Sequence, residues 1–141
     1  MQFVAQSGAQ LGRLLRMTSS TRRVPAPPVT ADSLTYLRVV ETITDSGITQ
    51  QQLAKAVGAS VRTVQNWSQG SATPRGTRVH RLLDIKHIVE LLRDTYTDEG
   101  IEIWLNSRNR NLDHQRPVDL LQQGRAEDVL AEVERLTGGM G

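Results

Sequence analysis

Three side chains that can form paired hydrogen bonds stand close together in the stretch GASVRTVQNWSQG, residues 58–70. If this stretch is helical, Arg62, Gln65 and Asn66 share its outward face within one turn and a half. An arginine matches the O6 and N7 atoms of guanine, and Asn or Gln matches the N6 and N7 atoms of adenine. The pattern predicts a short helix that can read base edges in the major groove of DNA.

Two helices and a tight corner must position that face. Thr49 is the predicted N-cap of a first helix, with Gln52 three residues later in a capping-box pattern. Gly58 closes this helix, because glycine adopts the left-handed backbone at little cost. Ser60 is a second N-cap only two residues on, so the second helix must leave at a steep angle. Gly70 ends it.

The two helices also carry an apolar inner face. The residues that can point inward are Ile48, Leu53, Val57, Val61, Val64 and Trp67. Any helical hairpin of an all-α protein could have such caps and a polar outer face, so a purely structural hairpin is the alternative to DNA binding.

The stretch resembles the Xre/Cro-type repressor family. The residues that carry the resemblance are Thr49-Gln50, Leu53-Ala54, Gly58, Ser60, Thr63-Val64, Trp67, Gly70 and Pro74. The resemblance implies that Gln50 meets a phosphate and that Val61, Arg62, Gln65 and Asn66 face bases. The complete predicted DNA-binding set is Gln50, Ser60, Val61, Arg62, Thr63, Gln65, Asn66, Arg75 and Arg78.

Catalytic and metal chemistry find little support in this chain. It has no cysteine, which excludes disulfides, thiolate metal sites and thiol nucleophiles. His80, Asp84 and His87 could share one helix face, but they lack a fourth ligand, and two-His metal helices usually have spacing i, i+4. The sequence has no phosphate-cradling glycine loop and no Ser/His/carboxylate motif. We therefore predict no enzyme activity, no metal and no cofactor.

Composition favours an all-α protein without membrane spans. The chain has 141 residues, of which 4% are aromatic, so Leu, Val, Ile and Ala must build the core. No run of eighteen apolar residues exists. Arg13 and Arg16 interrupt the only stretch that resembles a signal peptide. We expect a cytoplasmic protein.

Charge is distributed unevenly along the chain. Residues 1–30 carry four arginines and no acid (+4), residues 31–97 carry a net +2, and residues 98–141 carry a net −4. A chain that is basic at one end and acidic at the other suggests two different partners. A polyanion would contact the first half.

The same ranges are the predicted segments of the chain. Residues 1–30 form an N-terminal arm, either mobile or placing its arginines on DNA or a partner. Residues 31–97 form the DNA-binding domain: a helix through Leu34, Leu37, Val40 and Ile43, the two-helix corner, and a long helix from Thr77 to about Tyr96. The long helix has more apolar surface than one small domain can bury, which predicts self-association or docking of residues 98–141.

Residues 98–141 read as three short helices around a polar loop. The first contains Ile101, Ile103, Trp104 and Leu105, the second opens at Pro117 and ends at Gly124, and the third runs from Glu127 to Leu136. So little apolar mass cannot fold alone, so these helices should dock on the long helix.

This last third resembles the C-terminal toxin-binding domain of Xre/MbcA/ParS-type antitoxins. The residues that carry the resemblance are Trp104-Leu105-Asn106, Asn109, Leu112, Arg116 to Leu121, Gly124 and the last helix before Gly138. The resemblance implies a RES-domain toxin that degrades NAD as partner, and repression of a shared promoter. One DNA-binding head touches only a few base pairs, so we also expect a homodimer, which assembles with the toxin. The predicted toxin contacts are Asn109, Arg110, Arg116, Glu127, Glu134, Met140 and Gly141.

Two alternatives remain at this point. The Arg116 to Leu121 box is explained largely by packing, because Pro117 starts a helix, Leu120 and Leu121 suit a core, and Asp119 suits a helix N-terminus. The whole chain could also be a stand-alone dimeric transcriptional regulator without a toxin, but sensing a small molecule would need a pocket, and residues 98–141 are few to enclose one.

Overall fold

The chain is all-helical in the computed structural model, which describes residues 30–138. This confirms the predicted all-α class. The α-helices in the described residues are α2 (Ala31–Asp45), α3 (Gln50–Val57), α4 (Val61–Ser68), α5 (Thr77–Arg93), α6 (Asp98–Leu105), α7 (Pro117–Gln122) and α8 (Ala126–Thr137), with a short 3-10 helix η1 (Arg110–Leu112). Residues 1–29 of the predicted N-terminal arm (residues 1–30) and residues 139–141 lie outside the described residues, whereas Thr30 is described and caps α2.

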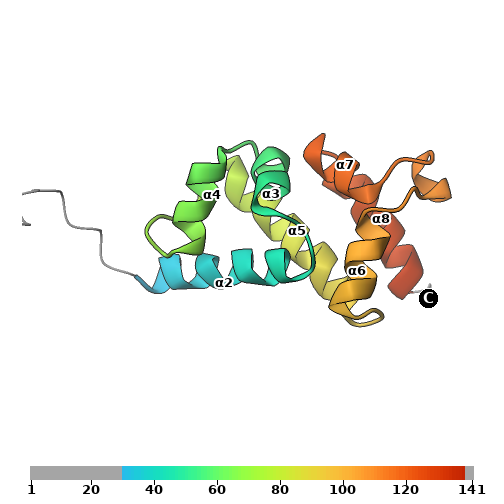
Figure 1. The fold of residues 1–141 in the computed structure, drawn as a ribbon, viewed down its shortest axis with the longest axis horizontal. Coiled ribbons are helices and arrows are strands. Elements are labelled where there is room, and N and C mark those ends of the chain that lie inside the picture. Colours follow the sequence, from blue (N-terminus) through green and yellow to red (C-terminus); the bar gives the residue numbers. More distant parts are fainter. Residues whose placement is uncertain (1–29, 139–141) are drawn as a thin grey trace, which may run out of the picture.

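Helix α2 forms the base of the N-terminal head, which comprises α2, α3, α4 and the first turns of α5. Thr30 caps α2 through a capping box with Ser33, and α2 packs against both α4 and α5 (Figure 1). Its buried apolar residues are Val39, Val40 and Ile43. The predicted helix through Leu34, Leu37, Val40 and Ile43 is present, but Leu34 is 40% exposed, and Ser33 is the buried residue of that turn.

Helix α5 is the spine that joins the head to the C-terminal lobe, which comprises α6, η1, α7 and α8. Its buried face carries Leu82, Ile85, Ile88, Val89 and Leu92. Helices α2 and α3 pack on it from the head, and α8 packs along it from the lobe (Figure 1). The docking of the C-terminal part on the long helix is therefore confirmed.

Head and lobe share one continuous core. The cluster of buried apolar residues runs from Val39 in α2 to Val133 in α8 without a break between the two halves. Helix α7 packs against α3, and the side chain of Glu102 from α6 lies against Gly47 at the corner between α2 and α3. The relative placement of the two halves is thus set by their packing on α5 and by these direct contacts between them.

None of the helices between residues 30 and 138 is long and apolar enough to span a bilayer.

Candidate functional site

The corner between α3 and α4 is built from the local signals seen in the sequence. The Thr49 hydroxyl accepts from the Gln52 backbone N–H at 3.0 Å, and the Gln52 side chain accepts from the Thr49 N–H at 3.0 Å. Gly58 ends α3 in the left-handed region, with φ +78°. The Ser60 hydroxyl then accepts from the Thr63 N–H at 3.1 Å and starts α4. The predicted caps and corner are confirmed.

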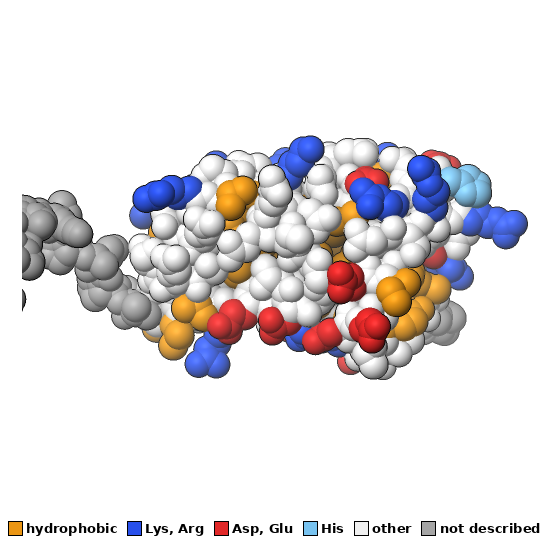
Figure 2. Space-filling model, viewed as in Figure 1, with side chains coloured by type: hydrophobic (Ala, Val, Ile, Leu, Met, Phe, Trp, Pro, Cys, Tyr) orange, Lys and Arg blue, Asp and Glu red, His pale blue; other side chains and the backbone are white. Residues whose placement is uncertain are grey.

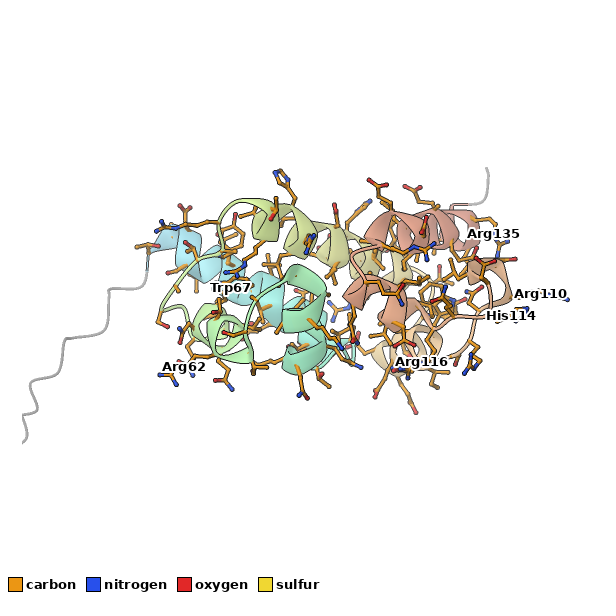
Figure 3. The ribbon with its side chains drawn as sticks, turned by 90° about the horizontal axis from the view of Figure 1, so that it is seen from above. Arg62, Trp67, Arg110, His114, Arg116 and Arg135 are labelled. Carbon is orange, nitrogen blue, oxygen red and sulfur yellow. The ribbon has the colours of Figure 1, made fainter. Side chains whose placement is uncertain are left out.

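Helix α4 is anchored on one side and open on the other. Val64 and Trp67 are fully buried and hold it on the core. Arg62 and Gln65 are exposed, Asn66 is half-buried, and Arg62 projects away from the body of the molecule (Figure 3). Arg62, Gln65 and Asn66 therefore lie on one helix whose opposite face is fixed in the core by Val64 and Trp67.

Several other predicted DNA-binding residues already have partners inside the protein. The Ser60 and Thr63 hydroxyls are 2.9 Å apart and hydrogen-bonded. The Gln50 side-chain amide donates to the Ser68 hydroxyl at 3.3 Å, tying the start of α3 to the end of α4. Val61 is half-buried against the core, so its side chain offers only a partial contact surface.

Arg78 supports the corner from α5. Its Nε and Nη2 donate to the Gly58 carbonyl oxygen at 3.2 and 2.9 Å. This carbonyl belongs to the end of α3, where backbone acceptors have no helical partner. Arg75 is exposed in the loop before α5. The sequence predicted both arginines as DNA-binding residues. No local pattern indicates that Arg78 also holds the turn at Gly58, twenty residues earlier.

A buried carboxylate holds the polar loop of the C-terminal lobe. Glu132 on α8 is only 6% exposed. It accepts from Arg135 at 3.0 and 2.9 Å, from the Asn111 amide at 3.1 Å and from the Asn109 amide at 3.5 Å. The Arg135 hydrogen bonds, helped by Asn111 and opposed by burial, hold the pKa of Glu132 below its ordinary value. The loop is thus clamped to α8 by an ionised side chain.

This clamp was missed by sequence reasoning. Glu132 and Arg135 are three residues apart on a helix, which is the spacing of an ion pair, and this local signal was available. The contact of Asn111 with α8 crosses 21 positions in the sequence, and no local pattern marks it.

Arg116 and Asp119 form a two-point ion pair at the start of α7. The Nε and Nη2 atoms of Arg116 each donate to a carboxylate oxygen of Asp119 at 2.8 Å. This hydrogen bonding lowers the pKa of Asp119 and raises that of Arg116. Pro117, Leu120 and Leu121 are buried, so packing accounts for the apolar part of the predicted box.

The remaining predicted toxin contacts differ in how open they are. Arg110 is exposed and points off the far end of the lobe, next to His114, whereas Asn109 is half-buried (Figure 3). Glu127 and Glu134 are exposed on α8 and lie seven residues apart, so they share a face. Met140 and Gly141 lie outside the described residues.

A groove of about 530 Å³ lies between η1 and α8. Its charged and amide lining residues are Asn111, Asp113, Arg125, Asp128, Glu132 and Arg135. His80, Asp84 and His87 on α5 are exposed, and the described residues contain no group of three or more His, Asp or Glu side chains placed to hold a metal ion.

The protein is all-helical and has two polar surfaces. One is the outer face of α4 in the head, and the other is the loop that Glu132 holds in the C-terminal lobe. They define a class of protein in which a two-helix corner packs on a small helical lobe. The family described as antitoxin Xre/MbcA/ParS C-terminal toxin-binding domain matches residues 90–139. The chain is 39% identical over 101 residues to a Mycobacterium tuberculosis protein named "Probable mycobacterial cidal antitoxin", covering 72% of this chain and 86% of that protein. The chain therefore belongs to the Xre/MbcA/ParS antitoxin family.

Two further matches agree with this family. The mycobacterial cidal antitoxin MbcA of Mycobacterium bovis is 29% identical over 94 residues, which is 67% of this chain and 83% of MbcA. The crystal structure of the M. tuberculosis MbcT–MbcA toxin–antitoxin complex contains a chain with a TM-score of 0.62 and 27% identity, covering 74% of this chain and 96% of that one. The resemblance in the C-terminal third is thereby confirmed, and the match begins at residue 90, within α5.

Proposed function

We propose that this antitoxin binds and masks a RES-domain toxin that degrades NAD, and represses its own operon through a helix-turn-helix formed by α3 and α4. The proposal rests on one observation: a candidate DNA-binding surface and a lobe of the toxin-binding type share a single core. The head presents the exposed polar face of α4, and the lobe that packs on it matches a toxin-binding domain. Neither surface resembles a catalytic site.

The proposed DNA contacts follow from what α4 leaves open. Arg62, Gln65 and Asn66 would read base edges, each through a pair of hydrogen bonds. Ser60, Thr63, Gln50, Arg75 and Arg78 would flank them and meet phosphates. One such head covers only a few base pairs, so a homodimer on paired half-sites is part of the proposal.

The proposed toxin contacts lie on the opposite half of the chain. Arg110 is the exposed cation of the loop that Glu132 clamps, and Glu127 and Glu134 add negative charge along α8. Asn109, Arg116, Met140 and Gly141 complete the proposed set. MbcA, a relative of this chain, forms a complex with the toxin MbcT, and this supports a toxin partner here.

A stand-alone dimeric regulator that senses a small molecule is the alternative, and the groove beside α8 is the feature that such a protein would use. Small-molecule pockets are mostly apolar with a few polar groups. The groove has charged and amide side chains from Asn111, Asp128, Glu132 and Arg135 among its lining. A polar segment of a partner protein suits this charged lining better than a mostly apolar metabolite does.

The test is a co-purification followed by two assays. The product of the adjacent gene is purified alone and with this chain, and NAD loss is measured with and without the antitoxin. DNA binding is measured on a duplex that carries the upstream region of the operon. The proposal predicts NAD loss that the antitoxin suppresses, and binding to the duplex. A neighbour that does not bind this chain would favour the stand-alone regulator.

A further inference from the structure

Three cations extend the open face of the head onto the lobe. Lys55 lies on α3, Arg116 caps α7, and Arg108 lies in the loop before η1; we call these three residues the basic rim. Helices α3 and α7 pack against each other, so Lys55 and Arg116 belong to neighbouring elements (Figure 1). Lys55 lies five positions after Gln50, or about 7 Å farther along α3. The rim therefore continues from the helix that supports α4.

Arg116 of the rim lies on the side of the molecule to which α4 is open. Arg62 and Arg116 project from the same side in Figure 3, whereas Arg135 of the same lobe lies on the opposite side. Figure 2 shows most Lys and Arg side chains on the upper part of the viewed face and most Asp and Glu side chains on the lower part. A polyanion that contacts α4 would thus meet positive charge as it passes over α3 and α7.

Two of the rim cations are held in place before any partner arrives. Asp119 fixes the Arg116 guanidinium with two hydrogen bonds, which leaves three of its five N–H groups to face outward. Arg108 donates from Nη1 to the His114 carbonyl oxygen at 3.1 Å. Fixed donors lose little side-chain entropy on binding. Asp119 is the local counter-charge, and Lys55, Arg108 and Arg116 together still leave the rim with a net positive charge.

We propose that the basic rim contacts the phosphate backbone of the same double-stranded DNA that α4 reads, so that the C-terminal lobe is part of the DNA interface. The inference rests on the proposed DNA binding and extends it. A single helix fills the major groove, so cations beside it meet the flanking backbone rather than base edges. The rim should therefore add affinity without sequence preference. The DNA should also cover part of the surface around Arg116, so DNA and toxin would share this one residue of the proposed toxin contacts.

The test is the salt dependence of DNA binding by the full chain. Two duplexes of equal length are used, one carrying the chain's own upstream region and one unrelated. Each phosphate contact contributes about 0.9 to the slope of log affinity against log salt. The variant Lys55→Gln/Arg108→Gln should lower the slope by about two on both duplexes. Over a fourfold rise in salt the wild type should then lose about tenfold more affinity than the variant.

Two further variants separate a contact from a change in net charge. Arg38→Gln/Lys86→Gln removes the same charge from α2 and α5, at residues without a proposed contact to DNA or toxin, and should leave the slope unchanged. Arg116→Gln/Asp119→Asn keeps the net charge and leaves no carboxylate unpaired, yet should lower the slope by about one. Thermal unfolding of each variant confirms that it is folded.

The outcomes distinguish the inference from the proposed function. The basic rim alone would be overturned if the wild type binds DNA and the salt slope is the same for the wild type, Lys55→Gln/Arg108→Gln and the control. The rim would also be overturned if the salt slope falls equally in Lys55→Gln/Arg108→Gln and in the control, since the change in net charge would then explain the effect. A wild type without affinity for either duplex would remove the repressor role and the rim together.

Discussion

Glu132 holds the amide loop of the lobe through two hydrogen bonds, from Asn109 and Asn111, and accepts two more from Arg135 on its own helix; all four favour its ionised form. Its pKa is lowered in the folded protein, mainly by Arg135, so the carboxylate contributes stability at pH values above its unfolded pKa of about 4.3. This contribution is lost as the pH falls from there through the folded pKa. We predict that the free energy of unfolding falls more steeply with acid in the wild type than in Glu132→Gln, as measured by urea unfolding at pH 7 and below pH 4.

The same substitution should also cost stability at neutral pH. Glutamine offers one acceptor oxygen and presents an NH2 group to the donors of Arg135 and Asn111, so about 1–3 kcal/mol should be lost. Glu134→Gln is the matched control, because it makes the same charge change at an exposed position of the same helix. Equal behaviour of the two variants would show that the clamp adds nothing to stability.

At the scale of elements, α4 is the part whose open face carries the proposed base reading. Arg62→Ala with Asn66→Ala should cost roughly 1–3 kcal/mol of binding for each lost pair of hydrogen bonds and should relax base preference at those positions. Binding to duplexes with single base changes measures both effects. Gln123→Ala, an exposed amide on the lobe, is the control and should change neither. Toxin binding by the double variant should stay intact.

The corner between α2 and α3 gives a second prediction at this scale. Gly47 has φ +99°, and a Cβ there would lie 2.7 Å from the Glu102 Cβ of α6, an atom that cannot swing away. Gly58 has φ +78°, but a Cβ there meets only the Arg81 Nη1 at 3.3 Å. Gly58→Ala should cost about 1–2 kcal/mol for its backbone, and Gly47→Ala should cost more because α6 must shift. Thermal unfolding compares the two.

Elements whose signals lie within a few residues were predictable from the sequence. Thr49 and Ser60 cap their helices through side chains that bond the backbone three residues away, and Gly58 makes the turn through its left-handed backbone, as predicted. The contacts of Arg78 with Gly58 and of Asn111 with Glu132 join distant segments, and they depend on how the helices pack.

At the scale of the whole molecule, head and lobe share a core, so they should unfold together. The chain has two tryptophans, Trp67 in the head and Trp104 in the lobe. Trp104→Phe leaves a reporter of the head, and Trp67→Phe leaves a reporter of the lobe. We predict the same urea midpoint by fluorescence and by circular dichroism within each variant. A fluorescence transition that separates from the loss of helix would show two independent units.

A core substitution in the lobe extends this prediction. Leu120 is buried in α7, which packs on α3. Leu120→Ala should cost about 2–5 kcal/mol, and Trp67 fluorescence should report the loss although the substitution lies in the other half of the chain. A shift confined to Trp104 would contradict the shared core.

The central claim is that one chain carries two separable activities, DNA binding and toxin masking. Suppression of NAD loss measures toxin masking directly. The toxin from the adjacent gene is assayed with the wild type, with Arg62→Ala/Asn66→Ala and with Arg110→Glu. The account predicts that the wild type and the α4 variant suppress NAD loss equally, while Arg110→Glu suppresses it less and still binds DNA. NAD loss that is absent from the start, or untouched by the wild-type chain, would contradict the account.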